Sequence, residues 1–176
     1  MRKVAVLAAG GTGGHLFPAQ ALAEALVARG WSIVLASDER VAGLSQDFPA
    51  ERRIGLSAAT YRPGDPIGMA RAGFAVLRGA GQARAAYREF GPNVVVGFGG
   101  YPSAPALVGA IIDRRPTVIH EQNAVMGRAN RRLAARVTRV ACAFPTRLKA
   151  PPRVASRAMV VGNPVRPAIR ALADLP

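Results

Sequence analysis

Short apolar runs alternate with amphipathic stretches along most of the chain. Residues 4–8 form a continuous apolar run of the length of a buried strand, and a glycine-rich segment follows at 10–14. Apolar residues then recur at helical spacing over 19–27, with Pro18 near the expected start of this helix and Gly30 just beyond its end. The same succession predicts further strands at 33–36, about 53–54, 93–96, 117–119, 137–141 and 159–161, and further helices at about 67–90, 103–113 and 127–135.

Strands that alternate with helices through short connections are typical of a parallel sheet whose two faces are both covered. The sequence therefore predicts an α/β fold, a Rossmann-like doubly wound parallel sheet with helices on both faces. A length of 176 residues fits one such domain. Because ligands of open α/β sheets bind outside the carboxyl ends of the strands, the residues that follow each strand are the candidates for function.

The composition excludes several classes of protein. Half of the residues are apolar, which is too many for a disordered chain. The one cysteine, Cys142, cannot form an internal disulfide, so a disulfide-stapled secreted scaffold is excluded and a reducing compartment is favoured. No apolar run approaches the roughly 20 residues that span a bilayer, and we interpret the apolar start at 4–9 as a strand rather than a signal peptide.

Positive charge is concentrated in the last third of the chain. With 24 lysines and arginines against 10 acidic residues, the formal net charge is +14. Residues 1–113 carry 11 basic and 8 acidic side chains, whereas residues 114–176 carry 13 basic and 2 acidic ones. This excess indicates an anionic partner, such as nucleic acid, a phosphate ligand or an acidic membrane, or else an arginine-rich solvated surface. Nucleic acid is disfavoured because only 6% of the residues are aromatic and no known binding module is recognisable.

Glycine clusters follow two of the predicted strands. Residues 10–15 read Gly-Gly-Thr-Gly-Gly-His, and residues 97–101 read Gly-Phe-Gly-Gly-Tyr. Glycine lets backbone N–H groups approach a ligand closely, and the N-terminus of the following helix adds free donors and a partial positive charge. Two such clusters at one sheet edge predict a phosphate or diphosphate site; the alternative is that they form only tight turns. The first cluster is neither a dinucleotide fingerprint, whose third glycine would fall on Leu16, nor a P-loop, which ends in Gly-Lys-Ser/Thr.

Both histidines lie close to predicted strand ends. His15 follows the first glycine cluster, where an imidazole can donate to a phosphate, act as a general base, or bond nearby backbone. We interpret His120 as structural, and Glu121 and Asn123 as functional, because polar side chains after an apolar strand are costly unless they are solvated or functional. His120 and Glu121 point to opposite faces of an extended strand, and the chain offers no other cluster of metal ligands. No metal and no cofactor are therefore predicted.

The predicted helix at 67–90 carries two apolar strips. The first is interpreted as the core face, and it comprises Met69, Val76, Ala80, Ala83 and Tyr87. The second comprises Ala70, Phe74 and Leu77, with Arg71 and Arg78 beside it. An apolar strip rimmed by arginine predicts contact with an acidic membrane surface; the alternative is a wide core face with solvated arginines.

A second basic element is the predicted helix at 127–135. Its arginines fall on one side if the helix continues far enough, and they are Arg128, Arg131, Arg132, Arg136 and Arg139. If the helix breaks before Arg139, four remain. This stripe predicts contact with lipid headgroups or with a diphosphate; the alternative is an arginine-rich solvated face.

Four motifs occur in an order and at a spacing that indicate one family. They are residues 10–15, residues 99–101 (Gly-Gly-Tyr), residues 120–123 (His-Glu-Gln-Asn) and residues 161–166 (Val-Gly-Asn-Pro-Val-Arg). In these motifs, from residue 1 to about 166, the chain resembles the MurG family of bacterial N-acetylglucosaminyltransferases, in glycosyltransferase family 28. The resemblance implies the N-terminal half of a two-domain GT-B fold.

The resemblance also implies an activity. Enzymes of this family are inverting hexosyltransferases of peptidoglycan synthesis, which move N-acetylglucosamine from UDP-N-acetylglucosamine to the undecaprenyl-diphosphate-linked muramyl-pentapeptide, lipid I, and give lipid II. By resemblance, residues 1–166 form the acceptor-binding domain and residues 167–176 begin the interdomain linker. A C-terminal domain that binds most of the donor is expected beyond this chain, and the fragment alone is expected to be inactive. The expected location is cytoplasmic, peripheral on the inner face of the bacterial plasma membrane.

Site residues follow from the same resemblance. The expected donor-binding residues are Thr12, Gly13, Gly14, Asn123 and Arg166. His15 is the expected catalytic residue, as base or as diphosphate partner. The residues expected to bind the acceptor diphosphate are Gly99, Gly100, Tyr101 and Glu121. Residues 56–63 differ from the glycine- and lysine-containing stretch of the family, so no acceptor contact is carried over to them.

Two other functions compete with the transferase. A non-catalytic module that binds membrane or diphosphate-lipid would use the same surfaces without a second domain. A nucleotide-sugar epimerase or dehydrogenase would need the dinucleotide fingerprint that is broken at Leu16.

Overall fold

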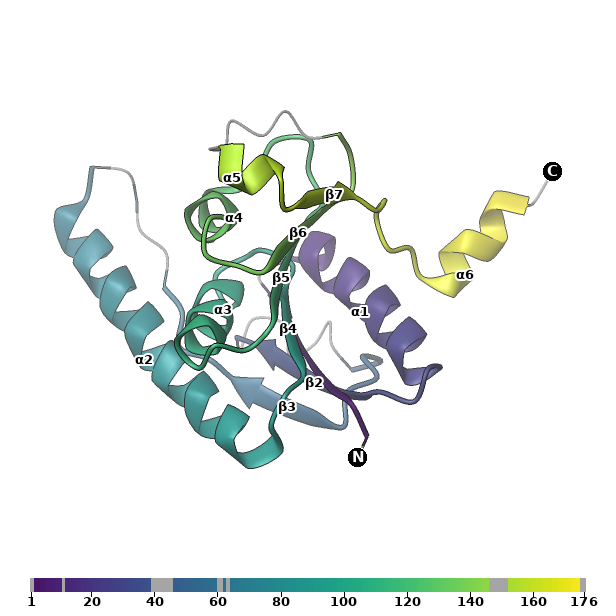
Figure 1. Ribbon diagram of the computed structural model, residues 1–176, viewed down its shortest axis with the longest axis horizontal. Helices are drawn as coiled ribbons and strands as arrows, with labels where there is room; N and C mark the ends of the chain where they lie inside the picture. Colours follow the sequence, from purple (N-terminus) through teal and green to yellow (C-terminus); the bar gives the residue numbers. More distant parts are fainter. Residues whose placement is uncertain are drawn as a thin grey trace.

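A seven-stranded sheet forms the centre of the computed structural model, which describes residues 2–10, 12–38, 46–59, 62, 64–145 and 152–174 (Figure 1). Its strands are β1 (Val4–Ala8), β2 (Ser32–Ser37), β3 (Arg52–Gly55), β4 (Val94–Gly97), β5 (Thr117–Glu121), β6 (Arg139–Cys142) and β7 (Ala158–Val160). They lie in the order β3-β2-β1-β4-β5-β6-β7, and every neighbouring pair is parallel. This order is that of a doubly wound Rossmann-like sheet, so the predicted fold class is confirmed.

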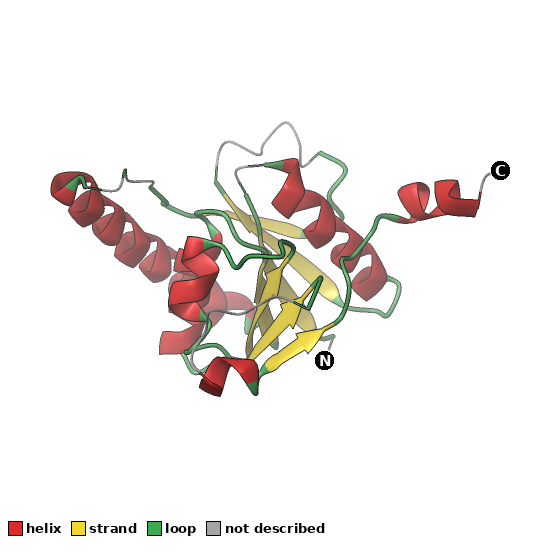
Figure 2. Ribbon diagram, turned by 90° about the horizontal axis from the view of Figure 1, so that it is seen from above, coloured by secondary structure: helices red, strands yellow, loops and turns green. Residues whose placement is uncertain are grey.

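Helices cover both faces of the sheet (Figure 2). The helical elements are α1 (Gly13–Val27), α2 (Pro66–Phe90), α3 (Ser103–Ile112), α4 (Arg128–Leu133), α5 (Pro152–Ala155), α6 (Pro167–Arg170) and the 3-10 turn η2 (Ala171–Asp174). The first packs on one face, and α2, α3 and α4 lie on the other (Figure 1). The short elements α5, α6 and η2 were not predicted from the sequence.

Strand β1 shows how one apolar run supplies two cores. Successive side chains of a strand point to opposite faces. Ala5 and Leu7 accordingly pack with Leu16 of α1, whereas Val6 and Ala8 pack with the α2–α3 layer. A run without polar positions is therefore what a strand buried on both faces requires.

Helix α1 begins inside the glycine cluster, so the predicted start near Pro18 is wrong. Thr12 is its N-cap, with extended backbone at φ −152° and ψ 158°. Pro18 lies within the helix, where its missing N–H leaves the carbonyl of Gly14 without the usual helical bond. The consequence is functional, because Gly13, Gly14 and His15 form the first turn. The N–H of His15 donates to the carbonyl of Thr12 at 3.2 Å, whereas the N–H groups of Gly13 and Gly14 have no acceptor within the helix.

Helix α2 packs on the domain through only part of its length, and Figure 1 shows its N-terminal end extending away from the sheet. Ala80, Ala83 and Tyr87 of the predicted core strip are buried, and the Tyr87 hydroxyl donates to the carbonyl of Ala106 at 3.0 Å. Burial raises the pKa of this tyrosine. Met69 is 53% exposed, so its assignment to the core is wrong. The helical period placed Met69 on the correct side, but the domain does not reach it there.

Candidate functional site

The two glycine clusters leave the sheet side by side. Strand order reverses between β1 and β4, and such a switch point is where doubly wound sheets bind ligands. Ala8 and Gly97 are register partners, and the N–H of Phe98 donates to the carbonyl of Ala8 at 2.9 Å. The predicted juxtaposition of the two clusters is therefore present in the structure. Gly11, within the first cluster, lies outside the described residues.

Two positions of the second cluster, where it contacts the first, require glycine. Gly99 and Gly100 have φ angles of 89° and 75°, in the left-handed region that side chains rarely adopt. A Cβ on Gly100 would lie 2.5 Å from the carbonyl oxygen of Gly10, and one on Gly99 would lie 3.0 Å from the ring of His15. The absence of side chains thus lets the imidazole of α1 rest directly on the neighbouring loop.

Ser103, at the start of α3, connects the two sides of this junction. Its hydroxyl lies 2.7 Å from the carbonyl of Ala8 and 2.6 Å from that of Gly99, and the residue is 1% exposed. Tyr101 follows the second cluster and is 43% exposed, so its ring remains accessible at the rim.

His15 stands at the centre of this arrangement. It is half-buried in the first turn of α1, and its Nδ1 is a buried nitrogen without a hydrogen-bond partner among the described residues. An imidazole at a helix N-terminus can accept the proton of a hydroxyl or donate to an anion, although Nδ1 itself is covered by the neighbouring Gly99 loop. The alternative from the sequence, a histidine bonded to nearby backbone, has no supporting bond at Nδ1.

Arg166 reaches the same end of α1 from the C-terminal part of the chain. Its guanidinium lies over the ring of Phe17, with 4.0 Å between Cζ and the ring centroid. The ring of Phe17 in turn packs against Gly13, where a Cβ would lie only 2.7 Å from the nearest ring carbon. This stack places a cation beside the first turn. Phe17 was not predicted to belong to the site, because an apolar residue on a helix is usually a core residue.

The end of β5 supplies the third part of the site. His120 is buried, its Nε2 lies 3.2 Å from the carbonyl of Gly162, and its ring centroid lies 5.3 Å from that of Phe98. Burial lowers its pKa. These contacts agree with the structural role expected for it, but its Nδ1 is buried without a hydrogen-bond partner among the described residues. Gln122 donates to the carbonyl of Phe98 at 2.9 Å and so ties this segment to the second glycine cluster.

Glu121 is 1% exposed and points into the protein. Its Oε1 accepts from the backbone N–H of Asn123 at 3.0 Å and from Nδ2 of Asn123 at 2.9 Å. Its Oε2 accepts from the N–H of Gly127 and from Nδ2 of Asn130, both at 2.9 Å. The structure thus gives Glu121 a holding role in the 122–127 loop, and a direct contact with a diphosphate stays a prediction without geometric support. Asn123 itself is exposed.

A cavity of about 460 Å³ lies on the α2 side of the same sheet edge. It is lined by Asp38 at the end of β2, by residues 55–58, and by Ala75 and Gln82 of α2. The N–H of Ser57 donates to Oε1 of Gln82 at 2.9 Å, and a Cβ on Gly10 would lie 3.3 Å from Asp38. The described lining holds a carboxylate, an amide and a hydroxyl but no cation, which suits hydroxyl and amide groups rather than phosphate. Residues 60, 61 and 63 of the 56–63 segment lie outside the described residues.

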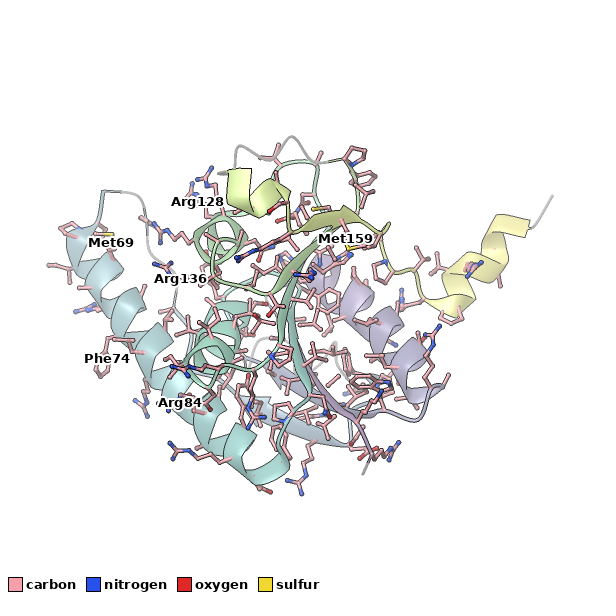
Figure 3. The ribbon with its side chains drawn as sticks, viewed as in Figure 1. Met69, Phe74, Arg84, Arg128, Arg136 and Met159 are labelled. Atoms are coloured by element: carbon pink, nitrogen blue, oxygen red, sulfur yellow. The ribbon has the colours of Figure 1, made fainter. Side chains whose placement is uncertain are left out.

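The predicted membrane-contact residues lie away from this junction, on the outer surface of α2. Phe74 and Leu77 are 70% and 66% exposed, and Arg71 and Arg78 are exposed beside them. Figure 3 shows Phe74 projecting from α2 away from the sheet, whereas Arg84 turns inward and forms an ion pair with Asp113 at 2.7 Å. The alternative of a wide core face is therefore wrong for Phe74 and Leu77.

The arginine stripe is shorter than a continuous helix would make it. Helix α4 ends at Leu133, and Arg139 belongs to β6, so the expected case of a break before Arg139 applies. Arg128, Arg131, Arg132 and Arg136 are all exposed. Figure 3 shows Arg128 and Arg136 on the side of the molecule that α2 also occupies.

The part of the chain that the structure describes contains neither a metal site nor a membrane-spanning helix. No group of three or more histidine, cysteine, aspartate or glutamate side chains within them is placed to hold a metal ion. None of the helices in the described ranges combines the length and apolar character needed to span a membrane.

Comparison with known proteins gives a consistent result. The chain is 85% identical over all 176 residues to a curated protein of Phenylobacterium zucineum, and 65% identical to one of Caulobacter vibrioides. Both are named UDP-N-acetylglucosamine–N-acetylmuramyl-(pentapeptide) pyrophosphoryl-undecaprenol N-acetylglucosamine transferase. The chain spans about half of these relatives, covering 48% and 49% of their length.

Solved structures agree on the fold. The chain superposes on MurG of Acinetobacter baumannii with a TM-score of 0.74 and 29% identity, over 92% of this chain and 46% of that one. A putative UDP-N-acetylglucosamine 2-epimerase of Listeria monocytogenes shares the fold at a TM-score of 0.67 and 15% identity, over 98% of this chain and 48% of that one. Residues 5–142 match the model of the glycosyltransferase family 28 N-terminal domain, and the chain therefore belongs to this family.

Proposed function

We propose that this chain is the acceptor-binding part of an inverting transferase that moves N-acetylglucosamine from UDP-N-acetylglucosamine to an undecaprenyl-diphosphate-linked muramyl-pentapeptide, in peptidoglycan synthesis. The observation that carries the proposal is the β1–β4 junction, where two glycine loops meet under the His15 ring. The relatives named for this reaction support it, since the nearest of those described above is 85% identical over the whole chain.

The chemistry required by this reaction fits the groups at the junction. The acceptor hydroxyl oxygen attacks the anomeric carbon, the bond from that carbon to the UDP oxygen breaks, and the configuration inverts. The hydroxyl proton passes to a base, for which the half-buried imidazole of His15 is the candidate at this junction, and UDP leaves as an anion. The N–H groups of Gly13 and Gly14, at the positive end of α1, favour the charge that develops on the leaving group.

The two substrates are assigned to different sides of the junction. Thr12, Gly13, Gly14, Asn123 and Arg166 face the donor, which a C-terminal domain beyond residues 167–176 would hold for the most part. Gly99, Gly100 and Tyr101 surround the acceptor diphosphate. The sugar and peptide of the acceptor extend toward the cavity beside Asp38, whose described lining suits hydroxyl and amide groups.

The exposed strip of α2 docks the domain on the membrane that carries the acceptor. Phe74 and Leu77 enter the interface, and Arg71 and Arg78 contact acidic headgroups beside them. We assign the protein on this basis to the inner face of the bacterial plasma membrane, as a peripheral protein.

Transfer by the full-length protein tests the proposal. With UDP-N-acetylglucosamine and a lipid-diphosphate muramyl-pentapeptide, we expect release of UDP in equal amount to the disaccharide product, with no added metal needed. Omission of either substrate should abolish release. If acceptor-containing vesicles bind the protein but no UDP is released, the chain is a non-catalytic lipid-binding module and the transferase proposal is wrong.

A further inference from the structure

A buried acid without a cation holds the loop that carries Asn123. Among the ion pairs of the described residues, none involves Glu121. An unpaired buried carboxylate is costly, and here its charge is balanced by four N–H donors, two on each oxygen. Two of the donors come from Asn123, and the others come from Gly127 and from Asn130 in α4. One carboxylate therefore fixes both ends of the 122–127 loop.

The carboxylate also decides which way the amide of Asn123 faces. A carboxylate accepts hydrogen bonds at both oxygens and donates none, so only the amide nitrogen of Asn123 can face it. The carbonyl oxygen Oδ1 is then the part of the exposed side chain that a ligand meets. Held this way, Asn123 accepts a hydrogen bond from a ligand.

We propose that Glu121 is a positioning residue, which orients Asn123 so that its amide oxygen accepts a hydrogen bond from a hydroxyl group of the donor sugar. This inference rests on the proposed transferase function. It gives Asn123 a ligand chemistry opposite to that of the glycine loops, which offer N–H donors to phosphate oxygens. It also accounts for the burial of Glu121, since a carboxylate facing a diphosphate would repel it.

The 122–127 loop lies next to the glycine cluster on which the His15 ring rests, so the orientation of Asn123 is coupled to the proposed site. Gln122 donates to the carbonyl of Phe98, within the second glycine cluster. Nδ2 of Asn130, which Glu121 also holds, lies 3.6 Å from the position of a Cβ on Gly99. The network thus extends from Asn123 to the loop on which the His15 ring rests.

Fluorinated donors test the amide orientation in the full-length protein. Each sugar hydroxyl of UDP-N-acetylglucosamine is replaced in turn by fluorine, which cannot donate a hydrogen bond. We expect one analogue to raise the KM of the parent by about 3- to 10-fold, the loss of one neutral hydrogen bond. In Asn123→Ala that analogue and the natural donor should have the same KM. If every analogue shows the same KM ratio in Asn123→Ala as in the parent, Asn123 reads no hydroxyl of the donor and the proposal is wrong.

Glu121→Gln tests the positioning role. Its amide nitrogen must face two of the four N–H donors, so we expect Asn123 to turn or to loosen and the discrimination to fall below about 3-fold. Inhibition by UDP, which lacks the sugar, should be unchanged, whereas a general collapse of the site would weaken it. Glu24→Gln, on the outer side of α1, is the matched control and should keep the parent pattern. Unchanged discrimination in Glu121→Gln would overturn the role of Glu121.

A measurement on the parent protein covers the case in which Glu121→Gln does not fold. The side-chain N–H of Asn123 that faces Glu121, assigned by its loss in Asn123→Ala, should exchange slowly with water because it is bonded inward. Exchange as fast as that of a solvated amide would overturn the proposed orientation. Binding of the same analogues measured by calorimetry gives the discrimination even if no transfer occurs, so failure of the transferase proposal is distinguishable from failure of this one.

Discussion

The β1–β4 junction and the outer surface of α2 are built in opposite ways. At the junction the residues are glycines, and without side chains the backbone of one loop approaches the next more closely than a Cβ would allow. On α2 large side chains are exposed, with Phe74 at 70% exposure and no cover from the residues that the structure describes. The first design fixes geometry and suits chemistry, which depends on positions to within fractions of an ångström. The second supplies area and charge, which suit a fluid surface that needs no fixed geometry.

The comparison predicts that single changes at the junction have the largest effect. In the full-length protein, His15→Ala should lower transfer by about 100-fold or more, the usual contribution of a positioned acid or base. The fold should survive, because His15 is only half-buried. A fall in kcat with an unchanged acceptor KM assigns His15 as the base, whereas a rise in KM assigns it to the diphosphate.

The control for this variant lies on the same helix. Gln20→Ala removes a side chain that bonds only Glu24 in the described structure, at 3.1 Å, and should leave transfer near the parent rate. Equal kinetics of His15→Ala and Gln20→Ala would show that His15 takes no part in the mechanism.

The sequence predicted most of the sheet because its signals are local. A continuous apolar run such as 4–8 reads as a buried strand wherever it lies, and glycine clusters mark strand ends by their own chemistry. The contacts that the sequence missed join residues on different elements of the fold. Phe17 meets Arg166, and Glu121 meets Asn130, only after the fold has brought their elements together.

Met69 shows a second limit of sequence patterns. The helical period assigns a residue to a side of the helix, but burial requires that another element be present on that side. Helix α2 extends beyond its partners near Met69, and no pattern within the helix records where the sheet ends. Phe74 and Leu77 are exposed for a different reason, because they lie on the outer surface of a stretch whose inner side carries the buried Ala72 and Gly79.

On α2 the comparison predicts intermediate effects that depend on side chains as a group. Phe74→Ser with Leu77→Ser, in the full-length protein, should lower partition onto vesicles containing acidic lipid by about 10-fold or more, since each apolar side chain contributes roughly 1.5–3 kcal/mol when fully buried. The rate with a water-soluble acceptor analogue should not change. Val27→Ser with Ile112→Ser removes two exposed apolar residues elsewhere and serves as the control. Equal partition of the two double variants would show that the α2 surface does not dock on lipid.

Arginines beside this strip should have the smallest effect, and salt should reveal it. Arg71→Gln with Arg78→Gln removes two charges, each worth about 1 kcal/mol near an acidic surface at low salt. The difference from the parent in vesicle partition should shrink as ionic strength rises, because exposed charges more than about 10 Å from their partners are screened at 0.1 M salt. The loss from the Phe74 and Leu77 double variant should persist in the same salt series, since burial of apolar area does not depend on screening. Transfer from the junction to a soluble acceptor should be the same in both double variants at every salt concentration. If the arginine variant instead lost transfer to the soluble acceptor, those arginines would belong to the ligand site, and the division between a fixed junction and an adaptable surface would be wrong.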